Sequence, residues 1–162
     1  MTEVTLAVLL DMFSQCCAGP ARPAAFPFRP QVIAIAQRTP RDPDSYVRFA
    51  DEAFSKFLGS PDAVDLDRFA DFEEVMRILL FYDGRSAKGL MRIVELSFEN
   101  PDISSAGVNA LAWLSNFLRI PASHIPAEEL DRFRSDLKRY AENRTLSHNA
   151  RACQDAMAQR LP

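Results

Sequence analysis

Hydrophobic and polar residues alternate along this chain with the spacing of amphipathic helices. Seven segments place apolar residues three and four positions apart, which puts them on one face of a helix. These segments cover approximately residues 2–17, 42–58, 65–83, 86–99, 104–120, 123–140 and 145–161. The pattern predicts a single all-α domain over residues 1–162, and 162 residues is an ordinary length for one domain.

Capping residues and prolines separate the segments. Asp42 followed by Pro43 predicts a helix start, and Gly59 predicts the end of that helix. Further N-caps are expected at Asp65, Ser86, Ser104 or Ser105, Ser123 and Thr145. Residues 19–30 contain four prolines and are predicted to form an extended connector. Residues 30–38 fit a short strand or a short helix, and helix is favoured because a lone strand has no partner.

The apolar residues also predict which helix faces are buried. In the segment over 65–83 the apolar arc is so wide that we expect a central, heavily buried helix. In the first segment, the residues expected to share the inward face are Val4, Val8, Met12, Phe13 and Cys16.

Composition narrows the class of protein. Hydrophobic residues make up 48% and charged residues 25%, as in soluble globular proteins. The net charge of −3 argues against a nucleic-acid partner, and no apolar run is long enough for a membrane span. Sixteen Arg against three Lys, with frequent Ala, suggests a bacterial source. The three cysteines are expected to be reduced, so we expect a cytoplasmic protein without a cofactor.

The spacing of the expected caps suggests a repeat. Every second cap is separated by 44, 39, 37 and 41 residues, close to the period of about 40–47 residues of HEAT and armadillo repeats. A plain bundle of short antiparallel helices gives similar spacings. The expected fold is therefore stacked antiparallel helix pairs, with an irregular helical bundle as the alternative.

Two runs of residues strengthen the likeness. The sequence of residues 107–117, GVNALAWLSNF, resembles the third helix of an armadillo repeat, although the order of Ala and Trp differs. Residues 148–153, HNARAC, resemble the small-residue second helix of a HEAT repeat. The resemblance covers at most about 120 residues. It implies an α-α superhelix that acts as a binding scaffold.

The sequence contains no recognisable catalytic or metal-binding motif. There are only two histidines, and Pro126 separates His124 from Glu128, so they are not expected to share a helix face as a metal pair. The neighbouring carboxylates Glu73 and Glu74 point about 100° apart on a helix and are expected to be solvated. An enzyme is therefore not expected, and an unrecognised carboxylate site is the alternative.

Charge is distributed unevenly along the chain. Residues 42–74 hold ten acidic and three basic residues, whereas residues 132–160 hold seven basic and three acidic ones. Asp67, Asp71 and Glu74 have a spacing of four and three, which predicts an acidic stripe on one helix. This stripe is either a solvated face or a docking surface for a basic partner.

Trp113 is the only tryptophan, and it lies nearly opposite the expected inward face of its helix. It is either buried between two layers or exposed to a partner. If exposed, it forms a binding hot spot with Asn109 and Asn116.

These observations favour a non-catalytic protein-binding module. The most specific hypothesis is a bacterial immunity protein or antitoxin that neutralises a basic toxin, such as a nuclease of a contact-dependent inhibition system. Immunity proteins of such systems are similar in size and charge, although they share no common motif. The alternative is a helical adaptor or regulatory subunit that binds a peptide or another protein.

Overall fold

A computed structural model describes residues 5–16, 34, 42–59, 66–120 and 125–160, and over these ranges the chain is all-helical, with no strand. Seven α-helices and two short 3-10 turns make up the elements of these ranges. The helices are α1 (Leu6–Cys16), α3 (Pro43–Leu58), α4 (Leu66–Tyr82), α5 (Ala87–Glu99), α6 (Ser104–Leu118), α7 (Ala127–Tyr140) and α8 (Ser147–Arg160). The turns are η3 (Gly84–Ser86) and η4 (Pro101–Ile103).

The all-α prediction is confirmed for these ranges. The connector predicted over 19–30 lies outside them, and so does the segment 30–38 apart from residue 34, which is helical. No helix of the described ranges is long and apolar enough to cross a membrane.

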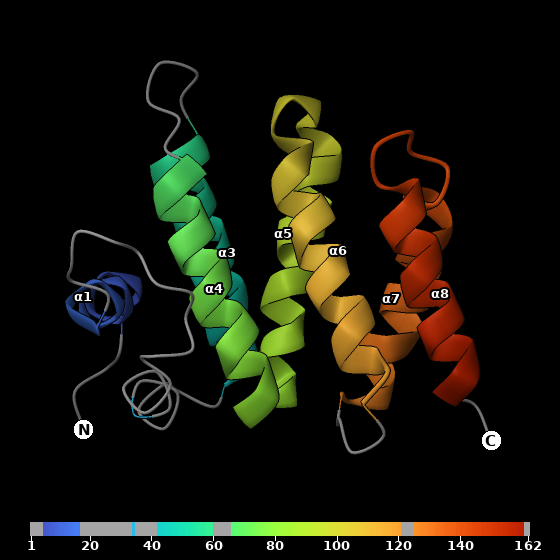
Figure 1. The fold of residues 1–162 in the computed structure, drawn as a ribbon, viewed down its shortest axis with the longest axis horizontal. Coiled ribbons are helices and arrows are strands. Elements are labelled where there is room, and N and C mark those ends of the chain that lie inside the picture. Colours follow the sequence, from blue (N-terminus) through green and yellow to red (C-terminus); the bar gives the residue numbers. More distant parts are fainter. Residues whose placement is uncertain (1–4, 17–33, 35–41, 60–65, 121–124, 161–162) are drawn as a thin grey trace.

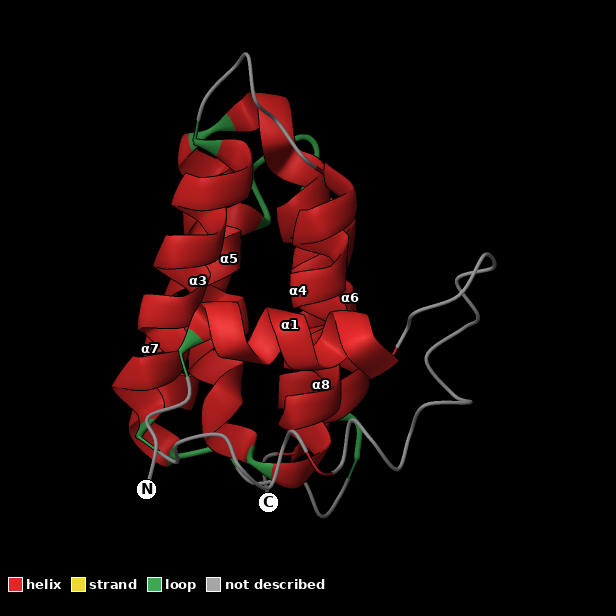
Figure 2. Cartoon of the chain, turned by 90° about the vertical axis from the view of Figure 1, so that its left-hand side faces the viewer, coloured by secondary structure: helices red, strands yellow, loops and turns green. Residues whose placement is uncertain are grey.

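Six of the helices form two layers. Helices α3, α5 and α7 make one layer, and α4, α6 and α8 make the other (Figures 1 and 2). Consecutive helices pair across the layers, and the pairs stand side by side in a row. Helix α1 runs crosswise over the end of this row formed by α3 and α4 (Figure 2).

The start of α3 follows the sequence prediction. The Asp42 carboxylate accepts a hydrogen bond from the Asp44 amide at 3.1 Å, and Pro43 occupies the first turn. This cap satisfies one of the amides that a helix start leaves without a backbone partner. Gly59 ends the helix as predicted.

The other described caps differ from the prediction. Ser86 stands at the N-cap position of α5 as predicted, but a 3-10 turn precedes both α5 and α6, so Ser86 has helical dihedrals and makes no side-chain cap bond. Asp83 caps this entry instead, accepting from the Arg85 amide at 3.2 Å. Ile103, not Ser104 or Ser105, stands at the cap position of α6. Before α8, the Asn143 side chain takes the role predicted for Thr145.

Helix α4 is heavily buried, as its apolar arc predicts, but it belongs to the first pair of the row, and the pair α5–α6 stands in the middle (Figure 1). Six of its apolar side chains are almost completely buried, namely Phe69, Phe72, Val75, Met76, Leu79 and Leu80. Burial of such side chains stabilises the fold by about 1.5–3 kcal/mol each. The α4 helix therefore connects the first helix pair with the rest of the row.

Of the inward face predicted for α1, the position of Val8 is wrong, and the side chains of Val4, Met12, Phe13 and Cys16 lie outside the described residues. The structure buries Leu6, Leu9 and Leu10, whereas Val8 is 41% exposed. Helix α1 carries apolar residues on more than one side, so its own pattern does not determine the buried face. Its packing across α3 and α4 determines that face instead.

Helix α8 is attached to α6 by side chains that donate hydrogen bonds to backbone carbonyls. The bonds run from Asn149 Nδ2 to Val108 O at 3.3 Å, from Cys153 Sγ to Leu111 O at 3.3 Å, and from Arg160 Nη1 to Leu118 O at 2.9 Å. The donors lie along one face of α8, so these bonds fix its position along α6.

The far end of the row is polar. Helix α7 buries Phe133, Leu137 and Tyr140, and its remaining surface carries mainly charged and polar side chains. Arg139 covers the ring of Phe98 from this surface, with its guanidinium carbon 4.9 Å from the ring centroid. The α7 surface at this end of the row therefore presents charged groups to solvent.

Candidate functional site

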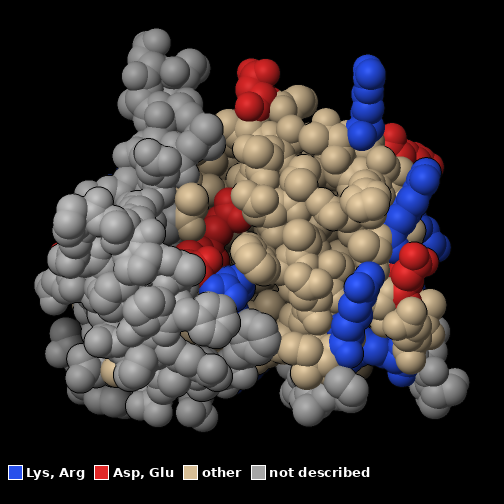
Figure 3. Space-filling model, viewed as in Figure 1, with Lys and Arg blue, Asp and Glu red and all other residues tan. Residues whose placement is uncertain are grey.

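The outward side of α6 has no charge. Its fifteen residues, Ser104–Leu118, include no Asp, Glu, Lys, Arg or His. On this side Asn109 and Asn116 are exposed and Trp113 is half-buried between them. We call the surface formed by Asn109, Trp113 and Asn116 the α6 face. Figure 3 shows uncharged atoms over the middle of the α4–α6–α8 layer, with charged side chains around it.

Trp113 is held in place by a side chain of the neighbouring helix. The guanidinium carbon of Arg77 on α4 lies 4.8 Å from the centroid of the Trp113 ring. Arg77 in turn binds both carboxylate oxygens of Glu74, with Nε donating to Oε2 at 3.1 Å. A cation over an indole ring is attracted by about 0.5–2 kcal/mol, depending on desolvation. The α6 face therefore has a fixed edge towards α4.

The predicted site residues have different outcomes. The structure brings Asn109, Trp113 and Asn116 together on one side of α6, and Arg77 joins Glu74 to them. The side chains of Asp67 and Asp71 lie outside the described residues. The Glu74 side chain is 27% exposed and already paired with Arg77, so it offers little free negative charge.

The opposite layer is rich in charge that is internally paired. Lys88 Nζ lies 3.0 Å from Asp44 and 3.5 Å from Glu129, and so connects α5 with both neighbours in its layer. Arg92 pairs with Asp51 at 2.6 Å and with Glu95 at 2.7 Å. Because these pairs use both signs of charge, this surface attracts neither acidic nor basic partners strongly. The two layers thus present different chemistry to solvent.

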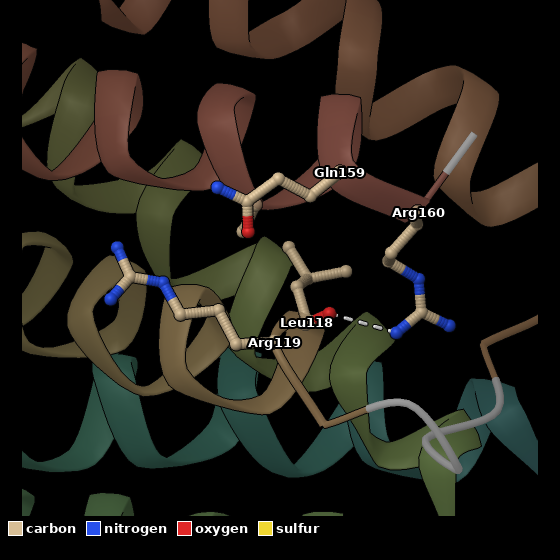
Figure 4. Close-up of a pocket in the computed structure, with 5 residues that line it drawn as sticks. Leu118, Arg119, Gln159 and Arg160 are labelled. Atoms are coloured by element: carbon tan, nitrogen blue, oxygen red, sulfur yellow. Dashed lines mark hydrogen bonds between the residues drawn. The ribbon is translucent and has the colours of Figure 1, made fainter.

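Two hollows accompany these surfaces. One of about 280 Å³ lies where α3, α5 and α7 begin, and Lys88 stands among its carboxylates. The other, of about 380 Å³, lies between the C-terminal ends of α6 and α8. Figure 4 shows Arg119 and Arg160 on opposite sides of Leu118, with their guanidinium groups pointing apart. Arg160 is bonded to the carbonyls of Leu118 and Ile120, so the two arginines do not form a clamp for an anion.

Glu73 is a residue whose environment was wrongly predicted. It is only 5% exposed, and its Oε2 atom has no hydrogen-bond partner. Burial raises the pKa of its carboxyl from 4.5 to about 8, so the group is mostly neutral at pH 7. The expectation of a solvated side chain is therefore wrong. Phe69, Met76 and Leu80 are one or two turns away from Glu73 on α4, and this spacing already places it beside the core.

Among the residues that the structure describes, no three His, Cys, Asp or Glu side chains gather in a way that would hold a metal ion. His124 lies outside these residues, and His148 is exposed. No known family model, curated protein or solved structure matches this chain.

Proposed function

We propose that this chain is a non-catalytic scaffold of stacked helix pairs that binds another protein through the α6 face. The observation that carries the proposal is a half-buried tryptophan on a charge-free surface. Interface centres are depleted in charged residues and enriched in Trp and Arg, and the energetic hot spots are enriched in the same two residues. Trp113 with Arg77 beside it has this composition.

The rigidity of the site also supports binding. Arg77 is fixed by Glu74 and by the Trp113 ring, so neither side chain loses much rotamer freedom when a partner docks. Ordering a flexible side chain at an interface costs about 0.5–1.5 kcal/mol. The exposed amides of Asn109 and Asn116 offer both donors and acceptors to the partner.

The helix spacing supports the repeat part of the proposal. The helices of one layer start 44 and 40 residues apart, at Pro43, Ala87 and Ala127. Those of the other layer start 38 and 43 residues apart, at Leu66, Ser104 and Ser147. A period near 40 with two helices per repeat is that of a HEAT-like stack. Such stacks use extended side-by-side helix faces for binding.

The test uses purified candidate partners encoded by the neighbouring genes, with calorimetry as the readout. Asn109→Glu and Trp113→Ala are expected to weaken binding at least tenfold, as hot-spot truncations do. Ser135→Glu, at an exposed position on α7 in the other layer, is the matched control and should bind like the wild type. Equal loss in all three variants, or no loss in any, contradicts the α6 face as the binding surface.

A narrower proposal concerns the partner. We infer a basic toxin or nuclease domain, with this chain as its immunity protein, from the excess of acidic residues over 42–74. Complementary charge speeds association and selects partners. Reversing the charge of Asp67 and Asp71 together is expected to slow association several-fold at low salt, with Glu74 left unchanged because it holds Arg77 beside Trp113. Unchanged association kinetics would favour the adaptor alternative, in which the α6 face binds a neutral peptide or protein.

A further inference from the structure

Glu73 and Glu74 compete for the same arginine. On α4, Glu74 is three residues before Arg77 and Glu73 is four residues before it, so both carboxyls are within one turn of the guanidinium. In the structure Arg77 binds Glu74 and lies over Trp113. Glu73, one turn away, is left buried with Oε2 unpartnered.

The protonation state of Glu73 decides which pairing is favoured. A neutral carboxyl in a buried place has little attraction for a guanidinium. An ionised carboxylate there cannot remain unpaired, because an isolated buried charge costs several kcal/mol. Glu73 lies four residues before Arg77, which is the acid-before-base order that stabilises an i, i+4 pair on a helix. Ionised Glu73 therefore competes with half-exposed Glu74 for Arg77.

We propose that Glu73 is a proton-controlled switch of the α6 face: when its carboxyl ionises, Arg77 leaves Glu74 and the Trp113 ring and pairs with Glu73. In the protonated state Trp113 is covered by a cation, as the structure has it. In the ionised state the indole ring loses that cover, and Glu74 becomes a free surface charge. The face thus changes from neutral to acidic with a more exposed tryptophan.

No other described charged group that packs near α4 takes the place of Arg77. Helix α6 has no titratable side chain, and the described acid of α1, Asp11, is exposed. Around η3, Arg85 is bonded to Asp83 at 2.9 Å. On α3 and α5 the charged side chains are exposed or ion-paired on the outer surface, namely Asp44, Arg48, Asp51, Glu52, Lys56, Lys88, Arg92, Glu95 and Glu99. Among the side chains that the structure describes, none other than Arg77 therefore offers the buried carboxyl a cation.

The raised pKa of Glu73, about 8, places the transition within a measurable range. Since Trp113 is the only tryptophan of the chain, its emission reports on the α6 face alone. We expect the emission of the folded chain to change in one step between pH 6 and 9.5, centred near pH 8. Glu73→Gln, which stays neutral, is expected to abolish the step, and so is Arg77→Gln, which leaves no cation to withdraw. Glu52→Gln, an exposed acid on α3, is the control and should retain the step.

Three results overturn the switch: no step in the wild type, a step that persists in Glu73→Gln, or a step that coincides with loss of the far-ultraviolet helix signal. If Glu73→Gln does not fold, carbon-detected NMR of the wild type decides instead. The Glu73 carboxyl and the Trp113 indole must then titrate with one midpoint, and separate midpoints refute the coupling. The measurement uses the chain alone, so its outcome does not depend on whether the α6 face binds a partner.

Discussion

Gly89 on α5 lies against the backbone of Tyr46 on α3. A Cβ atom at position 89 would come within 3.0 Å of the Tyr46 carbonyl oxygen and 3.2 Å of the Tyr46 Cβ. The same atom would lie 2.5 Å from the methyl end of Met76, which can move aside more easily than a backbone. The absence of a side chain at position 89 therefore allows α3 and α5 to pack at this distance.

The first prediction follows from this contact. Gly89→Ala improves helix propensity by about 1 kcal/mol, but it forces α3 and α5 apart and costs about 1–3 kcal/mol in packing. We expect a net loss in the free energy of unfolding, measured by urea denaturation. Ser105→Ala, at an exposed position of α6, should change stability by less than about 0.5 kcal/mol. An alanine at 89 that stabilises the protein would show that the helices tolerate a wider separation.

The second prediction concerns pH and Glu73. The folded chain retains a proton on Glu73 up to about pH 8, whereas the unfolded chain releases it near pH 4.5. The stability contributed by this retained proton is complete below pH 4.5 and is lost as the pH rises through about 8. The full slope is about 1.4 kcal/mol per pH unit for one proton. Urea denaturation should therefore give lower stability at pH 8 than at pH 5.

The matched variant for this prediction is Glu73→Gln. It keeps the shape of the side chain but cannot titrate. In this variant, most of the loss in stability that Glu73 causes between pH 5 and pH 8 should disappear. A wild-type protein that gains stability from pH 5 to pH 8, or a variant with an unchanged slope, would mean that Glu73 is not buried in solution.

The third prediction concerns the bond between α3 and the end of α4. The Tyr46 hydroxyl donates to Asp83 Oδ2 at 2.9 Å. Burial alone would raise the pKa of the Asp83 carboxyl. The hydrogen bonds from Arg85 and Tyr46 together lower this pKa by more than burial raises it, so the net shift is downward. Tyr46→Phe should cost about 1 kcal/mol at pH 7. The stability that Asp83 contributes is present above its ordinary pKa of 3.8 and is lost as the pH falls through the lower folded value.

The cost of Tyr46→Phe should therefore diminish as the pH falls below 3.8, which urea denaturation at a series of acidic pH values can measure. Asp83→Asn provides the second arm of a double-mutant cycle. If the two substitutions add without any coupling energy, the hydroxyl does not stabilise the carboxylate.

The fourth prediction concerns the reactivity of Cys153. This thiol is buried, donates to the Leu111 carbonyl, and has its pKa raised by burial to about 12. In a variant with Cys16→Ser and Cys17→Ser, the single remaining thiol should be unreactive towards a disulfide reagent at pH 8 until the protein unfolds. Unfolding in urea should expose the Cys153 thiol and allow it to react. Rapid labelling of the native protein would contradict the attachment of α8 to α6.

Much of the fold was predictable because the helix pattern is strong. The apolar arc of α4, the Asp42 cap and the stop at Gly59 follow from spacing and local chemistry, and the structure has all three. The side-chain caps predicted at Ser86 and Ser104 do not form, because a 3-10 turn comes directly before each helix. Local propensity does not distinguish these two ways of entering a helix.

The candidate site was predictable only in part. The spacing of Asn109, Trp113 and Asn116 correctly places them on one side of α6. The contact between Arg77 and Trp113 depends on how α4 packs beside α6, so no pattern within either helix indicates it. Glu73 was predicted to be exposed because it is an acidic residue, although its spacing from Phe69 and Met76 places it on the buried side of α4. A carboxyl that remains protonated breaks the usual link between polarity and exposure.

The charged outer surface of α7, at one end of the helix row, affects how copies of the chain can meet. A stack whose last pair ended in the same apolar surface as its first would accept another copy head to tail, and such contacts propagate into open filaments. Here α1 lies across the first pair, and the outer surface of α7 is charged. Adding another copy at α7 would have to strip water from those charges, which opposes head-to-tail stacking through that surface.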